Sequence, residues 1–160
     1  MIVVIMGVTG SGKSTVGVLL ARRLGWAFAD ADDFHPVANI AKMTRGEPLD
    51  DADRGPWLAA LRARIDVWLA EGRSAVLACS ALKRAYREEL LVSDAVKLVY
   101  LRGELLLIAE RVAERQGHFA KGGLLAGQYR DLEEPDNAVT VDARKDPEEL
   151  VAEICARLGV

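Results

Sequence analysis

The segment "IVVIMGVTGSGKSTVGVLLARRL", residues 2–24, decides the fold. Its first five residues are apolar and mostly β-branched, which is typical of a strand covered on both faces. A glycine-rich stretch follows at once. Beyond it, apolar side chains recur at the spacing of one helical face: Val16, Leu19, Leu20 and Leu24. A strand that passes through a glycine loop into a helix begins a βα unit, so this segment predicts an α/β fold.

Strand-like and helix-like segments alternate along the rest of the chain. Apolar runs predict further strands at 26–29, 75–79, 96–101 and 138–141. Most of these runs are apolar without alternation, as expected of strands in a parallel sheet with helices on both faces. Together with residues 2–6 they predict a three-layer α/β fold with a five-stranded parallel sheet flanked by helices.

Two later helices carry clear start signals. One follows Pro56, which suits a first helical turn, and its expected core face comprises Trp57, Leu61, Ile65 and Trp68. The other is expected to begin at Asp146 as N-cap, with Pro147 in the first turn and Glu149 closing a capping box. Its buried stripe is expected to comprise Leu150, Ile154 and Leu158.

The composition limits the classes of function. The chain has 160 residues, of which 51% are hydrophobic, and a formal charge of −3, so we expect one domain over residues 1–160 without a general attraction for nucleic acid or anionic membranes. Its two cysteines, Cys79 and Cys155, lie in apolar runs without metal-ligand spacing and indicate core thiols in a reducing compartment. The start of the chain lacks the pattern of a signal peptide, and we expect a cytoplasmic protein.

The glycine loop, "GVTGSGKST" at 7–15, matches the phosphate-binding pattern G-x-x-x-x-G-K-[ST] between a strand and a helix. Its backbone N–H groups and the start of the helix can neutralise a triphosphate locally. We expect Lys13 to reach the β- and γ-phosphates and Ser14 to bind Mg2+. A plain glycine turn is disfavoured because strand, loop and helix are in register. The residues predicted to bind ATP are Gly7, Val8, Thr9, Gly10, Ser11, Gly12, Lys13, Ser14 and Thr15.

An acidic stretch, "DADDFHP" at 30–36, follows the second predicted strand. We expect the first two strands to end side by side, which would bring this stretch to the terminal phosphate. Phosphoryl transfer to a hydroxyl uses one carboxylate at the acceptor and another at the metal. We therefore predict Asp32 as the acceptor base and Asp30 in the metal shell, the alternative for Asp32 being a structural cap. Asp33 is expected to be a solvated neighbour or a helix cap.

Two segments fit the sheet pattern poorly. Residues 35–55 are polar and turn-rich, and they are predicted to bind substrate. Residues 116–128, "QGHFAKGGLLAGQ", contain four glycines with a histidine and a lysine. A glycine-rich excursion on an α/β scaffold is a candidate mobile lid.

Several blocks together closely resemble gluconokinase: "DADDFHPVANIAKMTRGEPLDDADRGPWL" (30–58), "CSALKRAYREEL" (79–90), "YLRG" (100–103) and "RVAERQGHFAKGGLLAGQ" (111–128). The resemblance implies a P-loop kinase fold of the shikimate kinase type, a homodimer, and ATP-dependent phosphorylation of the 6-hydroxyl of D-gluconate. It also implies that Arg111 stacks on adenine and that Arg115 meets the phosphates when the lid closes. The chain departs from the family pattern where Gly127, rather than serine, precedes Gln128.

A sugar acid needs cations for its carboxylate and mixed donors and acceptors for its hydroxyls. The lid pair His118 and Lys121 is expected to cover the transferring group. The alternative for each basic residue is a solvated surface charge. The residues predicted to contact the substrate are His35, Lys42, Arg54, Ser80, Lys83, Arg87 and His118.

Two other functions stay open at this stage. One is another small-molecule kinase of the same fold, acting on shikimate, adenylyl sulfate or a nucleoside monophosphate; the last is disfavoured because no aromatic residue lies between Phe34 and Trp57. The other is a nucleotide-dependent regulatory switch, which would need a residue that positions water and a partner surface.

Overall fold

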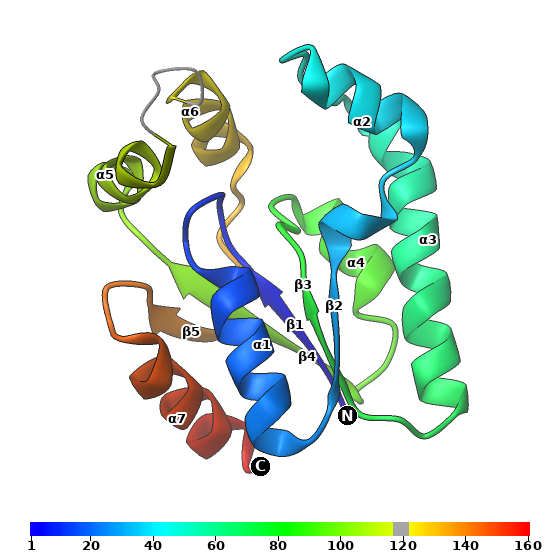
Figure 1. The fold of residues 1–160 in the computed structure, drawn as a ribbon. Helices are drawn as coiled ribbons and strands as arrows, with labels where there is room; N and C mark the ends of the chain where they lie inside the picture. The colour runs from blue at the N-terminus through cyan, green and yellow to red at the C-terminus, as the bar shows by residue number, and fades with distance from the viewer. Residues whose placement is uncertain (117–121) are drawn as a thin grey trace.

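Five parallel strands form one sheet in the order β2-β3-β1-β4-β5 in the computed structural model, which describes residues 1–116 and 122–160 (Figure 1). This confirms the α/β prediction. Each predicted strand lies within one or two residues of the observed one. The strands are β1 Ile2–Met6, β2 Ala27–Asp30, β3 Ala75–Ala78, β4 Val96–Arg102 and β5 Val139–Asp142.

The expectation that the first two strands end side by side is wrong, because β3 lies between them. Val76 of β3 pairs with Val3 of β1 on one side and with Phe28 of β2 on the other. The connection through the first helix therefore passes over one strand position, and the chain later fills that position with β3. Sequence patterns identify strands but do not encode the order in which strands pair.

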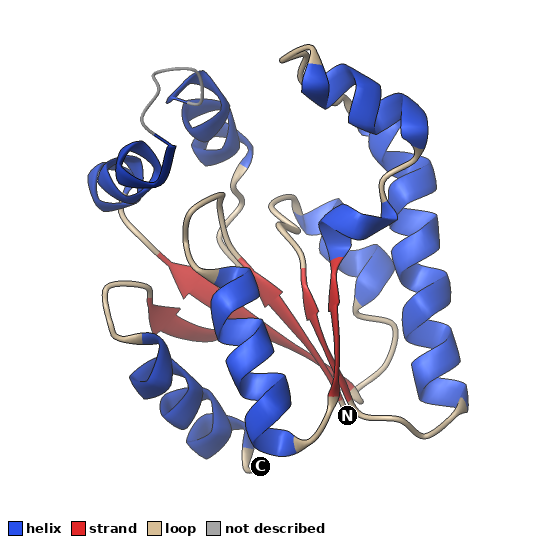
Figure 2. Ribbon diagram, viewed as in Figure 1, coloured by secondary structure: helices blue, strands red, loops and turns tan. Residues whose placement is uncertain are grey.

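Helices cover both faces of the sheet (Figure 2). Their bounds are α1 Lys13–Leu24, α2 Val37–Thr44, α3 Asp51–Ala70, α4 Arg84–Leu90, α5 Leu105–Gln116, α6 Gly122–Asp131 and α7 Pro147–Leu158, with a 3-10 turn, η1, at Ala31–Phe34. Beyond the carboxyl ends of the strands, α2 lies on one side and α5 and α6 lie on the other (Figure 1). The predicted substrate segment 35–55 forms α2 and the start of α3.

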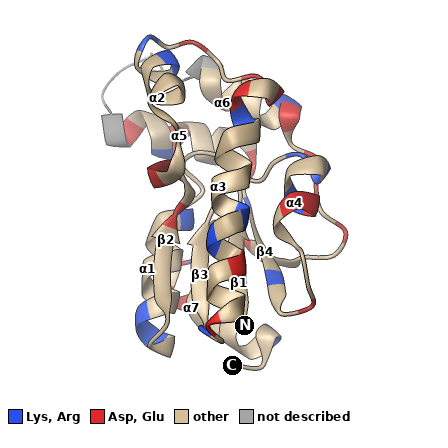
Figure 3. Cartoon of the chain, turned by 90° about the vertical axis from the view of Figure 1, so that its right-hand side faces the viewer, with Lys and Arg blue, Asp and Glu red and all other residues tan. Residues whose placement is uncertain are grey.

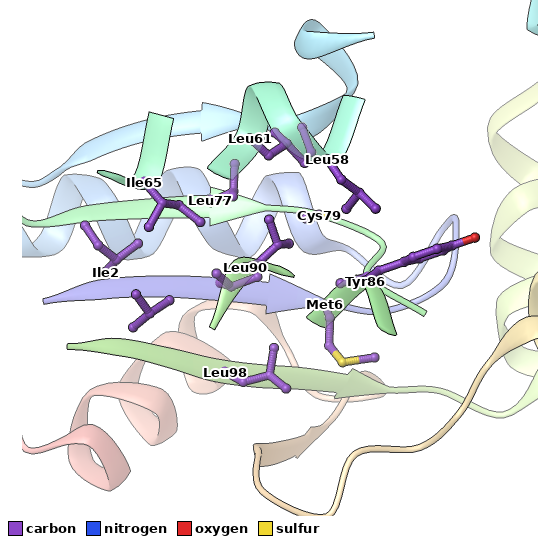
Figure 4. Packing of buried hydrophobic residues seen from close by; sticks show 14 of the residues in the cluster. Ile2, Met6, Leu58, Leu61, Ile65, Leu77, Cys79, Tyr86, Leu90 and Leu98 are labelled. Carbon is purple, nitrogen blue, oxygen red and sulfur yellow. The ribbon is translucent and has the colours of Figure 1, made fainter. Parts of the chain in front are cut away.

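Alternate residues of β1 serve two separate cores. Val3 and Ile5 pack with residues of α1 and α7, whereas Ile2, Val4 and Met6 pack with residues of α3 and α4. Figure 4 shows the second core, where side chains of α3 and α4 meet those of β1, β3 and β4. The strand is therefore buried on both faces, which explains its unbroken apolar sequence.

This packing creates a topological switch point. The neighbouring strands β1 and β3 are followed by α1 and α4, which lie on opposite faces of the sheet. In open α/β sheets, ligands bind outside the carboxyl ends of the strands at such a point. We therefore expect the ligand site at the loops after β1 and β3.

The predicted start of α3 is wrong, whereas that of α7 is confirmed. Helix α3 begins at Asp51, with Asp50 and Asp53 forming a capping box, so Pro56 lies inside the helix rather than in its first turn. The reciprocal bonds of the capping box set the start and outweigh the preference of proline for the first turn. Helix α7 begins after Asp146 with Pro147 first and Glu149 in the capping box.

Most of the predicted core residues are buried, whereas Leu19, Leu24 and Leu158 are only partly buried. Trp57 and Trp68 are at most 1% exposed, and both thiols, Cys79 and Cys155, are buried and reduced. Acidic and basic side chains are interspersed along α3 and α4 (Figure 3). None of the helices in the described ranges combines the length and the apolar character that crossing a membrane requires.

Candidate active site

The loop from Gly7 to Gly12 links β1 to α1 and has the backbone of a phosphate cradle. Gly12 has φ 98° at the N-cap of α1, a conformation that side chains rarely adopt. At Gly7, a Cβ would lie 2.9 Å from the carbonyl oxygen of Leu101. The Ser11 hydroxyl is buried in this loop without a hydrogen-bond partner among the described residues, which leaves a polar group there for a ligand.

Lys13 folds back over this loop, and its Nζ donates a hydrogen bond to the carbonyl oxygen of Val8 at 2.9 Å. Burial lowers the pKa of Lys13, while the Asp32 carboxylate, Cys79 and Asp30 act in the opposite direction. The ammonium group therefore lies close to the acidic stretch after β2. A phosphate in the loop would supply a further negative charge to this half-buried cation.

Ser14 and Asp30, the pair predicted to bind the metal, are in direct contact. Ser14 Oγ, in the first turn of α1, donates to Asp30 Oδ2 at the end of β2 at 2.5 Å, although β3 separates β2 from the strand that precedes α1. The other carboxylate oxygen accepts from the backbone N–H of Asp32 at 3.0 Å, so Asp30 also caps η1. The structure thus joins the glycine loop to the acidic stretch.

This pair fits Mg2+, which binds through one or two protein oxygens and completes its shell with phosphates and water. Within the described ranges, no group of three or more His, Cys, Asp or Glu side chains is placed to hold a metal. A site that depends on the nucleotide phosphates agrees with both observations.

Strand β3, which lies between β1 and β2, is followed by Cys79 and Ser80 and not by an acidic residue. Burial raises the pKa of the Cys79 thiol to about 12, so this residue is not a thiolate at neutral pH. Next to it, Ser80 is half-buried, and its carbonyl oxygen accepts from the backbone N–H of Gly7 at 3.4 Å.

Asp32 lies in η1 with an exposed side chain. Burial lowers the pKa of both Lys13 and His35, and the charge of Asp32 opposes that effect at each, so Asp32 lies near both the glycine loop and the start of the substrate segment. Asp33 is exposed, and the cap of η1 is Asp30 instead. The solvated reading of Asp33 is therefore right and its cap reading is wrong.

His35 is held between two helices. Its ring stacks on Trp57 of α3 with centroids 4.7 Å apart and planes 8° apart, and its Nδ1 lies 3.3 Å from the side-chain nitrogen of Asn39 in α2. Burial lowers the pKa of His35, and Arg54 does the same, against the opposing effect of Asp32. Sequence reasoning missed Asn39 and took Trp57 only as a core residue.

A second polar cluster lies where α3 meets α4. Asp51 accepts a hydrogen bond from Lys83 at 2.9 Å and another from the hydroxyl of Tyr86. The cationic groups of Arg54 and Lys83 lie 5.7 and 5.6 Å from the centre of the Tyr86 ring. The structure therefore brings the predicted residues Arg54 and Lys83 together, on a tyrosine that sequence reasoning missed.

Lys42 and Arg87 bind protein groups instead. Lys42 forms an ion pair with Asp53 at 2.7 Å between α2 and α3. Arg87 is buried, and its Nη1 donates to the carbonyl oxygens of Ala81 and Leu82 at 3.0 and 2.8 Å. The structure does not join these two to the cluster around Tyr86, and their substrate contacts stay a prediction.

On the other side of the site, Arg111 in α5 donates to the carbonyl oxygen of Ala143, after β5, at 2.7 Å. Arg115 lies in α5, but its side chain is outside the described part of the chain. The predicted lid pair, His118 and Lys121, also lies outside the described residues.

Helix α6 contacts the glycine loop through Gln128. The backbone N–H of Thr9 donates to Gln128 Oε1 at 2.6 Å, and Gln128 Nε2 donates to the Thr9 hydroxyl at 3.0 Å. The two residues are 119 positions apart, and no local pattern indicates such a pair.

Known proteins share both sequence and fold with this chain. A family model described as shikimate kinase matches residues 9–158. A gluconokinase of Gluconobacter oxydans is 43% identical over 155 residues, which cover 94% of this chain and 87% of that protein. A thermoresistant gluconokinase of Escherichia coli is 43% identical over 135 residues, covering 84% of this chain and 77% of that protein.

Solved structures of related proteins have the same fold as this chain. The crystal structure of a gluconokinase from Sinorhizobium meliloti superposes with a TM-score of 0.88 at 43% identity, covering 98% of this chain and 90% of that chain. Shikimate kinase from Aquifex aeolicus, at 22% identity and a TM-score of 0.61, shares the fold. On these matches and this site, the chain belongs to the gluconokinase family, within the P-loop kinase fold of shikimate kinase.

Proposed function

We propose that this chain transfers the γ-phosphoryl group of ATP to the 6-hydroxyl of D-gluconate. The observation that carries the proposal is the contact of Ser14 with Asp30, which sets Asp32 beside the glycine loop, with His35 near Asp32. A kinase needs this arrangement because the acceptor hydroxyl must lie in line with the terminal phosphate. The gluconokinase relatives supply the identity of the acceptor.

The loop residues bind the phosphates through backbone N–H groups, and Lys13 turns from Val8 to the β- and γ-phosphates. Ser14 and Asp30 would hold Mg2+, whose charge offsets that of the phosphates when it is bound. Asp32 accepts the proton of the 6-hydroxyl as its oxygen bonds to the γ-phosphorus. The bond from that phosphorus to the β,γ-bridging oxygen breaks, and ADP leaves with that electron pair.

The substrate segment 35–55 and the loop after β3 would bind the sugar acid. We assign its carboxylate to Arg54 and Lys83, which both lie near the Tyr86 ring, Lys83 with an acidic partner, Asp51. Hydroxyl contacts fall to His35 and Ser80, with Lys42 and Arg87 at the edge of the site. Residues 116–128 would form the lid, with Arg111 at the adenine and with Arg115, His118 and Lys121 at the phosphates.

We further propose a single kinase domain over residues 1–160 that acts as a homodimer in the cytoplasm. Light scattering of the purified protein measures the dimer against the chain mass of 17.4 kDa.

The test is ADP release with Mg2+ and ATP in the presence of a panel of acceptors: D-gluconate, other sugar acids, shikimate, adenylyl sulfate and a nucleoside monophosphate. We expect release that depends on D-gluconate and is lost in Lys13→Ala. Release with shikimate or a nucleotide alone would favour another kinase of this fold. Release that ignores every acceptor would favour the switch.

A further inference from the structure

Asn39 is a buried polar residue whose side-chain nitrogen has two partners. It lies in α2, is 3% exposed, and its Nδ2 donates to the backbone carbonyl oxygen of Asp53 at 2.8 Å. A carbonyl oxygen only accepts, so this bond determines which end of the Asn39 amide faces α3. The side-chain nitrogen, with its second hydrogen, therefore also faces the ring of His35.

This orientation determines the tautomer of His35. Nδ1 of the ring lies 3.3 Å from Asn39 Nδ2, which is a donor, so Nδ1 must act as the acceptor. A neutral imidazole then carries its proton on Nε2, at the opposite edge of the ring. The stacked Trp57 holds the plane of the ring and is itself held by a bond from its Nε1 to the carbonyl oxygen of Ala31 at 2.7 Å.

The surroundings keep this ring neutral. Burial lowers the pKa of His35, and the charge of Arg54 on α3 adds to that effect, while Asp32 on η1 opposes it. In the described part of the chain, no hydrogen bond engages Nε2 of His35. A neutral His35 ring can therefore donate a hydrogen bond from its Nε2–H. The neighbouring Asp32 carboxylate can only accept one.

We propose that Asn39 is a positioning residue that locks His35 as the Nε2–H tautomer, so that the imidazole donates to an oxygen of the sugar acid. The acceptor's identity rests on the function proposed above; the tautomer does not. Asp32 and His35 therefore have different roles. Asp32 accepts the proton of the substrate hydroxyl, whereas His35 donates a hydrogen bond to the substrate and accepts no proton.

Nitrogen NMR of the imidazole rings reads the tautomer directly. The chain has two histidines, so a His118→Gln variant assigns the signals of His35. In the full-length protein at pH 7.5, we expect Nδ1 at the shift of an unprotonated ring nitrogen and Nε2 at that of a protonated one. A protonated Nδ1 in this protein, alone or together with a protonated Nε2, overturns the proposal, whatever the variants show.

Two substitutions test the role of Asn39. Asn39→Ala should give averaged shifts of both tautomers, and Asn39→Asp, which can only accept, should move the proton to Nδ1. Asn137→Ala, at an exposed asparagine, is the matched control and should leave the spectrum unchanged. Circular dichroism establishes that each variant is folded, and if Asn39→Asp is not, Asn39→Ala decides. An Nε2–H tautomer that persists in folded Asn39→Ala contradicts the lock.

Kinetics separate positioning from a purely structural role. We expect Asn39→Ala to raise the KM for gluconate about tenfold, as for one lost hydrogen bond, with kcat changed less than about twofold. In a His35→Ala background the same substitution should add almost nothing. Equal effects in both backgrounds would mean that Asn39 acts through α2 and not through His35. Absence of gluconate turnover with the expected NMR spectrum would reject the proposed function and leave the tautomer standing.

Discussion

Asp32 and Asp33 are adjacent and both exposed, yet their surroundings differ. Burial lowers the pKa of Lys13 and of His35; the charge of Asp32 opposes this at both groups, and Asp33 is not among the charges that do so. The sequence alone predicted Asp32 as the base because the acidic stretch at 30–36 follows the end of a predicted parallel strand. It could not exclude a cap role, which the structure assigns to Asp30 instead.

The pair offers a matched test of the base. Asp32→Asn keeps the shape of the side chain but removes the proton acceptor, so kcat should fall by about 10²- to 10⁴-fold. Affinity for ATP, measured by calorimetry, should stay near that of the wild type. Asp33→Asn is the control and should retain turnover. Near-normal turnover in Asp32→Asn would reject the base role.

The lowered pKa of His35 predicts how the free energy of unfolding depends on pH. Its pKa in the folded protein lies below the ordinary value of 6.5, so the unfolded state takes up the proton first as the pH falls. The free energy of unfolding contributed by the neutral ring is therefore present above pH 6.5 and is lost as the pH falls from there toward the folded pKa. Urea unfolding between pH 7.5 and 5 should show a smaller loss for His35→Gln than for the wild type; equal losses would contradict the shift.

The site residues that the sequence did not predict are those whose partners lie far away in the chain. Asn39, Tyr86 and Gln128 are ordinary helix residues by pattern, and their importance comes from contacts with other elements. The glycine loop was predictable because its chemistry is encoded within nine consecutive residues.

At the scale of elements, α6 and the glycine loop are tied by the two bonds between Gln128 and Thr9. Gln128→Ala should lower the free energy of unfolding by about 2 kcal/mol, about 1 kcal/mol for each lost bond, and should lower Tm by several degrees. Differential scanning calorimetry measures this. Thr9→Val removes only the hydroxyl bond and should show about half the loss. Equal melting of Gln128→Ala and wild type would mean that the contact does not stabilise the loop.

Helix α3 begins at its capping box, and this start can be tested. Asp50→Ala removes the side chain that accepts from the Asp53 backbone, and we expect it to lower the free energy of unfolding by about 1 kcal/mol. Asp66→Ala, which loses only an exposed ion pair with Arg62, is the control and should change it by less than about 0.5 kcal/mol. Urea titrations give both values. Equal effects would indicate that the cap does not determine the start of α3.

Elements were predictable to the extent that their signals are local. Apolar runs located all five strands, and Asp146 with Glu149 located the start of α7. Pro56 misled because proline has the same local preference at a first turn whether or not a stronger cap lies before it. In α3 the reciprocal hydrogen bonds of Asp50 and Asp53 determine where the helix begins.

At the scale of the molecule, strand order decides how the site is divided. Strand β3 separates β1 from β2, and the contact of Ser14 in α1 with Asp30 at the end of β2 joins the segments that follow these two strands. The nucleotide loop follows β1, whereas the acceptor groups follow β2 and β3. Local patterns are silent on this order, since a crossover of the same length can reach the adjacent strand position or the next.

Binding of ATP with Mg2+ should therefore stabilise the whole fold, because the ligand would contact both the glycine loop after β1 and Asp30 at the end of β2. At about 100 times the dissociation constant, the expected gain is about 2.7 kcal/mol, or roughly 5 to 11 °C in Tm for a chain of this size. Chelation of Mg2+ by EDTA should remove most of this gain, and Asp30→Asn should already lack the part that depends on Mg2+. Since Asp30 also caps η1, the comparison is made on the shift caused by Mg2+ and not on the Tm of the variant alone. An undiminished Mg2+ shift in Asp30→Asn would show that the metal is held from the side of the glycine loop alone, without the strand beyond β3.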